Sequence, residues 1–68
     1  MIVMSIAGVD PSAGAGVFAD LKTFQAIGVY GTGIVTALTA QNPYKFFSTK
    51  PVSEEYICEQ IDSVMDSY

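Results

Sequence analysis

The sequence has few of the residues that form the disulfides or metal sites by which small domains are usually stabilised. Its 68 residues include one cysteine, Cys58, and no histidine, which excludes an internal disulfide and leaves no histidine for a metal cluster. A chain of this length buries only about 60% of the surface that its unfolded form exposes. A lone thiol suits a reducing compartment, and nothing near Cys58 marks it as reactive, so we interpret it as a small packing residue.

Positive charge is also scarce. Three lysine and arginine residues stand against seven aspartate and glutamate residues, and the formal net charge is −4. This balance argues against binding nucleic acid through its phosphates. The apolar opening, residues 1–7, is short and has no basic region, so it is neither a signal peptide nor a membrane span. We expect a cytoplasmic, soluble chain with no metal site of its own.

Half of the residues are hydrophobic, and they are arranged in segments. Residues 2–7 form a short, nearly continuous apolar run, typical of a central parallel strand. A loop rich in glycine follows at residues 8–16, and a helix is predicted over residues 14–27. Gly28 is predicted to end that helix, because glycine adopts the left-handed backbone conformation found at helix C-termini at little energetic cost. The apolar stripe of the helix consists of Val17, Leu21 and Phe24.

The second half continues the same alternation. A strand is predicted over residues 33–40, and Asn42-Pro43 ends it. Phe46 and Phe47 indicate a short third strand or a packed loop. Ser53 is a credible N-cap for a last helix, whose apolar stripe is Ile57, Ile61, Val64 and Tyr68. The pattern predicts the opening βαβ(β)α portion of a mainly parallel α/β sheet with helices on both faces, too small to complete such a layered domain.

The loop at residues 8–16 is the strongest functional feature. Ligands of open α/β sheets bind beyond the carboxyl ends of the strands, and this loop leads into a helix N-terminus. A plain turn explains its glycines equally well. Residues 14–19 match a loose GxGxxA dinucleotide pattern, weakened because six residues precede it after the strand and no acidic residue ends the second strand.

Four polar side chains are candidates for ligand contact, each with a plainer interpretation. Asp20 could face a cleft, but an acid early in a helix is more often solvated. Asp10 before Pro11 is typical of a turn residue that bonds its own backbone. Gln41 and Asn42 could bind a heteroaromatic ring, but a polar strand end is the better interpretation from spacing alone.

Residues 6–23, IAGVDPSAGAGVFADLKT, closely resemble the start of the hydroxymethylpyrimidine/phosphomethylpyrimidine kinases of thiamine biosynthesis. The similarity continues through residues 28–31, 36–42 and 60–64 and covers essentially the whole chain. Two departures stand out. Ala13 replaces a glycine that is usual in the family, and residues 43–47 differ from its usual small, polar continuation.

The resemblance implies a ribokinase-like fold, of which residues 1–68 are the N-terminal fragment of a single domain. It implies transfer of the γ-phosphate of ATP, with Mg²⁺, to 4-amino-5-hydroxymethyl-2-methylpyrimidine and then to its monophosphate. It also implies a homodimer. Family members are about four times longer, and their catalytic and nucleotide-binding residues lie in the later part. We therefore expect no catalytic residue and no kinase activity in this segment alone.

The resemblance also implies a set of substrate-binding positions. Asp20 would hydrogen-bond the substrate, and Gln41 would bind polar atoms of the pyrimidine. Thr39 and Ala15 would shape the pocket, and Gly8 matches a further position in it.

Three other interpretations remain open. The first is a fragment of a pyridoxal-type kinase of the same superfamily, although the DPSxGAG and AD pattern favours a pyrimidine. The second is a dinucleotide-binding βαβ module. The third is a non-catalytic fragment that associates through unpaired strand edges.

Overall fold

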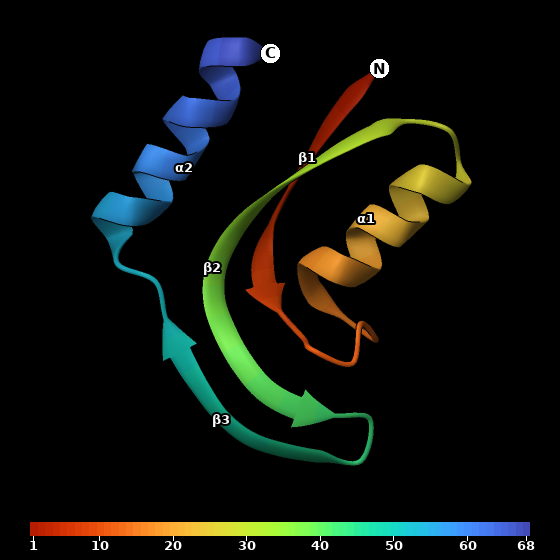
Figure 1. The fold of residues 1–68 in the computed structure, drawn as a ribbon, viewed down its shortest axis with the longest axis vertical. Helices are drawn as coiled ribbons and strands as arrows, with labels where there is room; N and C mark the ends of the chain where they lie inside the picture. The colour runs from red at the N-terminus through yellow and green to blue at the C-terminus, as the bar shows by residue number, and fades with distance from the viewer.

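A computed structural model describes residues 1–68, and Figure 1 shows their arrangement. The elements follow the predicted order. They are β1 (Ile2–Val9), α1 (Gly16–Ala26), β2 (Tyr30–Asn42), β3 (Lys45–Pro51) and α2 (Glu54–Ser67). The second strand is longer at both ends than predicted. Of the two alternatives predicted around Phe46 and Phe47, a short strand or a packed loop, the structure has the strand.

The sheet is mixed and has the order β1-β2-β3. β1 and β2 are parallel, with Ile2 opposite Tyr30 at one end and Val9 opposite Leu38 at the other. β2 then curves past the end of β1 and pairs with β3 in antiparallel fashion (Figure 1). We call residues 39–49 the hairpin arm. It places the last residues of β2 beyond the carboxyl end of β1, beside the loop that follows β1.

Helix α1 packs on the sheet through two glycines of β2. A Cβ atom built on Gly31 would lie 2.6 Å from Phe24 Cδ2, and one built on Gly33 would lie 2.7 Å from Val17 Cγ1. These distances are shorter than real contacts, so only glycine lets the helix approach this closely. Val17 is buried, and the predicted apolar stripe of α1 is confirmed. Gly28 has φ 79°, as expected of a residue that ends a helix.

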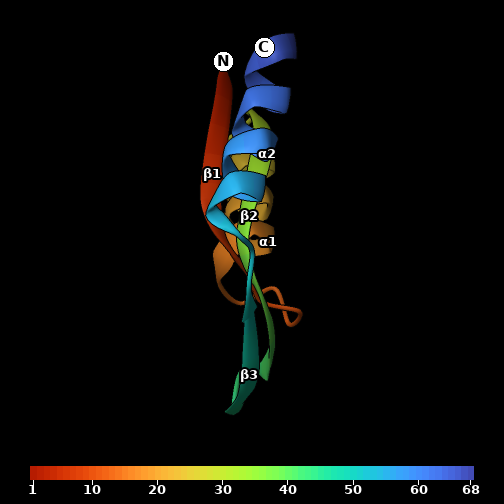
Figure 2. The same ribbon diagram turned by 90° about the vertical axis from the view of Figure 1, so that its left-hand side faces the viewer.

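Helix α2 contacts the other face of β2. Successive side chains of a strand point to opposite faces, and Gly31 faces α1. The ring of its neighbour Tyr30 instead lies 5.7 Å from the ring of Tyr68, at the end of α2. Figure 1 shows the two helices on either side of β2, and Figure 2 shows how thin the molecule is in the perpendicular view. The prediction of helices on both faces is confirmed.

A glutamine ties α2 to the backbone of β2. Gln60 Oε1 accepts a hydrogen bond from the Val35 N–H, and Gln60 Nε2 donates one to the Val35 carbonyl, both at 2.9 Å. These bonds satisfy the backbone groups of Val35 at an edge of β2 that β3 does not cover. At the next residue, the Val52 N–H donates to the Thr36 carbonyl. Ser53 caps α2, as predicted, by accepting from the Tyr56 N–H at 3.2 Å.

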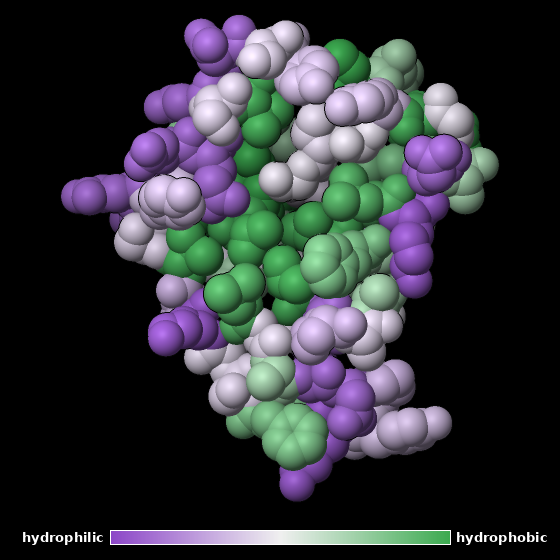
Figure 3. All heavy atoms as spheres, in the orientation of Figure 1, coloured by the Kyte–Doolittle hydropathy of each residue, from purple (hydrophilic) through white to green (hydrophobic).

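The core is small for so apolar a chain. Only Ser5, Asp10, Val17 and Ile34 are buried. Ile2 and Ile6 of β1 are more than half exposed, and apolar side chains gather in the middle of the face seen in Figure 3. Cys58 is exposed on α2, so its interpretation as a packing residue was wrong. Neither helix is long and apolar enough to cross a membrane.

Candidate functional site

The loop after β1 is organised around the carboxylate of Asp10. Its Oδ1 accepts hydrogen bonds from the Ser12 hydroxyl at 2.6 Å and from the Ser12 N–H at 2.9 Å. Its Oδ2 accepts from the Gly14 N–H at 3.1 Å. The Ser12 hydroxyl first, and then the backbone N–H groups, lower the pKa of Asp10 below 3.8. The interpretation of Asp10 as a turn residue is confirmed, and its carboxylate occupies the inside of the loop.

Two residues of this loop have left-handed backbone angles. Gly16 has φ 67°, and a Cβ atom there would collide with the carbonyl oxygen of Gly8. Ala13 has φ 62°, an angle that costs a residue with a Cβ atom about 1–2 kcal/mol. The alanine that departs from the family pattern therefore adopts a glycine-like conformation, at some cost in stability.

Helix α1 begins directly after this loop. Its N-cap is Ala15, which has an extended backbone and no side chain that could accept a hydrogen bond from the helix. The first turn also contains no acidic residue. Val9 and Gly16 form an isolated β-bridge, which brings the start of the helix against the end of β1. Gly8 and Gly16 therefore lie close together at the carboxyl end of β1, and Ala15 directly precedes Gly16.

Asp20 lies one turn further along α1 and is held against the sheet. Ser5, buried in the middle of β1, donates its hydroxyl to Asp20 Oδ2 at 2.6 Å. Asp20 Oδ1 has no partner within the chain, and no buried side-chain oxygen lacks a partner, so Oδ1 is accessible. Asp20 is thus half-buried and oriented, rather than the solvated acid that spacing alone favoured.

Ser5 is the site residue that sequence reasoning missed. The signal was present, because Ser5 is the one polar side chain in the apolar run at residues 2–7. A buried hydroxyl needs a hydrogen-bond partner, and Asp20 supplies it.

Gln41 and Thr39 are connected in the hairpin arm. Gln41 Nε2 donates to Thr39 Oγ1 at 2.8 Å, and Thr39 Oγ1 donates to the Val9 carbonyl at 2.7 Å. This chain of bonds joins the arm to the end of β1. Asn42 has a different role, because its Oδ1 accepts from the N–H groups of Tyr44 and Lys45 and so closes the hairpin turn.

The structure therefore gathers four of the five predicted site residues around one place. Gly8 and Ala15 form the loop side, and Thr39 and Gln41 form the arm side, joined through Val9. Asp20 lies further along α1, where the Ser5 hydroxyl fixes its carboxylate. The Gln41 amide and the Asp20 carboxylate each have one atom bound to a hydroxyl of the chain and one oxygen left accessible.

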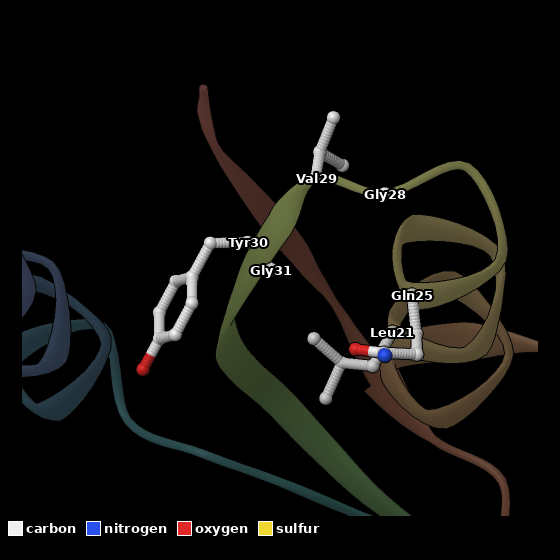
Figure 4. A pocket seen from close by; sticks show the side chains of 6 residues that line it. All are labelled: Leu21, Gln25, Gly28, Val29, Tyr30 and Gly31. Carbon is white, nitrogen blue, oxygen red and sulfur yellow. The ribbon is translucent and has the colours of Figure 1, made fainter.

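A cavity of about 520 Å³ lies at the other end of the sheet. Figure 4 shows its lining, with Leu21 and Gln25 reaching from α1 and Tyr30 pointing away from them. It lies at the start of β2, whereas ligands of parallel α/β sheets bind at the carboxyl ends of the strands. It also contains no ionisable acid or base suited to chemistry, so we place the candidate site at the loop and the arm.

The family model and the curated relatives point to one family. The model of the phosphomethylpyrimidine kinase family matches residues 10–68. A hydroxymethylpyrimidine/phosphomethylpyrimidine kinase from Rhizobium meliloti is 51% identical over 63 residues, which are 93% of this chain and 24% of that protein. The chain thus spans about a quarter of the length of the curated relatives it matches.

Solved structures of a phosphomethylpyrimidine kinase and of a pyridoxal kinase have the same fold as this chain. A crystal structure of phosphomethylpyrimidine kinase from Clostridium difficile matches with a TM-score of 0.94 at 45% identity, covering 98% of this chain and 29% of that one. The pyridoxal kinase from Staphylococcus aureus in complex with AMP-PCP matches with a TM-score of 0.83 at 35% identity, covering 96% of this chain and 24% of that one. The predicted fold class, the opening of a ribokinase-like α/β sheet, is confirmed.

Proposed function

The chain belongs to the phosphomethylpyrimidine kinase family, and we propose on that basis that it is part of an ATP-dependent kinase of thiamine biosynthesis. The substrates are 4-amino-5-hydroxymethyl-2-methylpyrimidine and its monophosphate. The observation that carries the proposal is the placement of Asp20 and Gln41, each oriented by a hydroxyl of the chain and each with an accessible oxygen. Oriented acceptors suit a small ring that carries an amino group and a hydroxymethyl group.

In this proposal the chain binds and orients the pyrimidine. Asp20 accepts a hydrogen bond from the substrate, and Gln41 binds polar atoms of the ring. Gly8 and Ala15 leave room beside the loop, since neither carries a side chain larger than a methyl group. Thr39 shapes the pocket between the hairpin arm and β1, and its hydrogen bond to the Val9 carbonyl holds the arm and β1 together.

The phosphoryl-transfer machinery is assigned to other parts of the protein. No group of three or more histidine, cysteine, aspartate or glutamate side chains is placed to hold a metal ion in this chain. The loop N–H groups of Ser12 and Gly14 are bound to Asp10 and are not directed at a phosphate. In this proposal, residues 1–68 contribute no part of the MgATP site. The AMP-PCP complex of the pyridoxal kinase supports ATP as the phosphoryl donor of the complete enzyme.

The same proposal covers domain organisation and assembly. Residues 1–68 form the N-terminal part of one ribokinase-like domain, and the complete protein is a cytoplasmic homodimer. The exposed apolar side chains of β1 support a need for further packing partners. The exposed thiol of Cys58 suits a reducing compartment. The chain alone is inactive, because it holds only part of a substrate pocket.

The pyrimidine is preferred over the other interpretations. The pyridoxal kinase is 35% identical to this chain, against 45–51% for the phosphomethylpyrimidine kinases. A dinucleotide-binding module is not supported, because Asp10 fills the loop where a pyrophosphate would need free N–H groups.

A coupled ADP-release assay tests the proposal. The protein at its native full length should turn over the hydroxymethylpyrimidine with MgATP, and its specificity constant for pyridoxal should be lower. The isolated chain of residues 1–68 should show no turnover above a denatured control. A full-length protein that phosphorylates only pyridoxal would contradict the pyrimidine assignment, and turnover by the isolated chain would contradict its inactivity.

A further inference from the structure

The bonds around Thr39 determine which way the Gln41 carboxamide faces. The Thr39 hydroxyl has one hydrogen, and it is directed at the Val9 carbonyl, which can only accept. The remaining capacity of Thr39 Oγ1 is to accept, so the group that approaches it must be the nitrogen end of the Gln41 amide. The orientation of the amide thus follows from the network itself.

One side of the Gln41 amide is left for a ligand. Its Oε1 has no partner in the chain and is accessible, and Nε2 retains one N–H beyond the bond to Thr39. Reversing the amide would set Gln41 Oε1 against Thr39 Oγ1, and Thr39 would have to abandon either that contact or the Val9 carbonyl. Reversal therefore forfeits one hydrogen bond.

We propose that Thr39 is a positioning residue that locks the Gln41 carboxamide with its oxygen toward the ligand, so that the site selects a 4-aminopyrimidine over a 4-oxopyrimidine. The inference rests on the proposed function and adds a reason for its specificity. A 4-aminopyrimidine presents an N–H donor beside a ring-nitrogen acceptor, which complements an amide oxygen beside an N–H. The 4-oxo ring presents the reverse, an oxygen acceptor beside a ring N–H donor, and would need the reversed amide.

The test compares 4-amino-5-hydroxymethyl-2-methylpyrimidine with its 4-oxo counterpart in the protein at its native full length. Calorimetry gives both dissociation constants, and their ratio is the selectivity. Thr39→Val keeps the shape of the side chain but has no hydroxyl, so it should lower the selectivity about fivefold, the equivalent of one typical hydrogen bond. Thr39→Ser restores the hydroxyl and should restore the ratio.

Thr32→Val is the matched control. Thr32 Oγ1 donates to the Val3 carbonyl of β1 at 3.1 Å, the same kind of cross-strand bond, but no glutamine bonds to Thr32. This variant should lose similar stability and keep the wild-type selectivity. A merely structural role of Thr39 would make Thr39→Val and Thr32→Val behave alike.

The outcomes separate the two proposals. If the wild-type protein binds neither pyrimidine, the proposed function fails, and this inference fails with it. If the wild type prefers the amino ring and Thr39→Val prefers it equally, only the inference is overturned. A second measurement needs no variant, since wild-type NMR spectra should show nuclear Overhauser contacts between the Gln41 side-chain amide protons and Thr39. Their absence would also overturn the inference.

Discussion

The two helices are joined to the same strand in different ways. Helix α1 lies on glycines of β2, so close that a single added carbon atom would collide, and it contributes the buried Val17. Helix α2 contributes no buried residue and is held by the two hydrogen bonds of Gln60 and by the contact between Tyr68 and Tyr30. The contact of α1 depends on close packing against glycines, and the contact of α2 depends largely on hydrogen bonds. Asp20 of the candidate site lies on the tightly packed side.

This difference indicates where rigidity is needed. Asp20 and its partner Ser5 lie across the contact of α1 with β1, so the close packing of α1 also fixes the carboxylate. The α2 side carries none of the proposed pocket residues, and its Tyr56, Met65 and Tyr68 side chains are more than half exposed. Substitutions should therefore have larger effects at the α1 contact than at the α2 contact.

The largest loss is expected for Gly16→Ala, at the start of α1. The new Cβ atom would meet the Gly8 carbonyl at a left-handed backbone angle, and strain plus overpacking should lower the free energy of unfolding by about 3 kcal/mol or more. Gly28→Ala is the control, since it has φ 79° but open space around it, and should lose only about 1–2 kcal/mol. Urea denaturation measures both, and equal losses would contradict the steric account.

The next largest loss is expected for Gly33→Ala, under the middle of α1. Its Cβ atom would lie 2.7 Å from Val17 Cγ1, and overpacking of this kind costs about 1–3 kcal/mol. Because the helix must shift to relieve it, Asp20 should also move relative to Ser5, and affinity for the pyrimidine should fall. Unchanged stability and affinity would show that α1 is not tightly packed.

On the α2 side, Gln60→Ala removes both bonds to Val35. Each net hydrogen bond contributes about 0.5–1.5 kcal/mol, and water can replace part of the loss at a half-exposed edge, so we expect about 1–2 kcal/mol. Pyrimidine affinity should stay close to wild type. The exposed neighbour Glu59→Ala serves as the control and should be neutral within error. A large drop in pyrimidine affinity for Gln60→Ala would contradict the claim that the α2 contact does not influence the candidate site.

A smaller loss is expected for Ser53→Ala, which removes the N-cap of α2. Capping side chains contribute about 1 kcal/mol, and only the Tyr56 N–H loses its partner. Ser67→Ala, at the other end of the same helix, is the matched control. Thermal unfolding of both variants would reveal a difference, and identical midpoints would contradict the cap.

The smallest effect at neutral pH, because it appears only in acid, concerns Asp10. Its pKa in the folded protein is lowered from 3.8 by the Ser12 hydroxyl and backbone bonds. The stabilisation is therefore complete above about pH 5 and is lost as the pH falls through 3.8 and then through the lowered pKa. Stability curves of wild type and Asp10→Asn should converge below pH 3.8, whereas curves that stay parallel would show that the carboxylate contributes nothing through its charge.

The sequence predicted the order of the elements because local chemistry determines it. The glycine-rich loop, Gly28 after α1 and Ser53 before α2 each act through their own backbone or side chain. It did not predict that β2 starts at Tyr30, because Gly31 and Gly33 weaken the strand pattern locally. Those glycines are required by α1, a contact between residues distant in sequence.

The candidate site was predictable only in part, for the same reason. Asp10 could be assigned to its turn because its partners are two and four residues away. The partner of Asp20 is 15 residues away, and Thr39 bonds a carbonyl 30 residues away. Periodicity contains no information about such pairs. Family resemblance selected these positions, and the fold then supplied the contacts that orient them.

The most direct test of the central claim is an amide-correlation NMR titration of the full-length protein with 4-amino-5-hydroxymethyl-2-methylpyrimidine. If the pocket lies between the loop after β1 and the hairpin arm, the signals of Gly8, Asp20 and Gln41 should shift, while those of Cys58 and Met65 on α2 stay in place. Shifts confined to Gln25, Gly28 and Val29 would place the ligand in the cavity at the other end of the sheet and contradict the account.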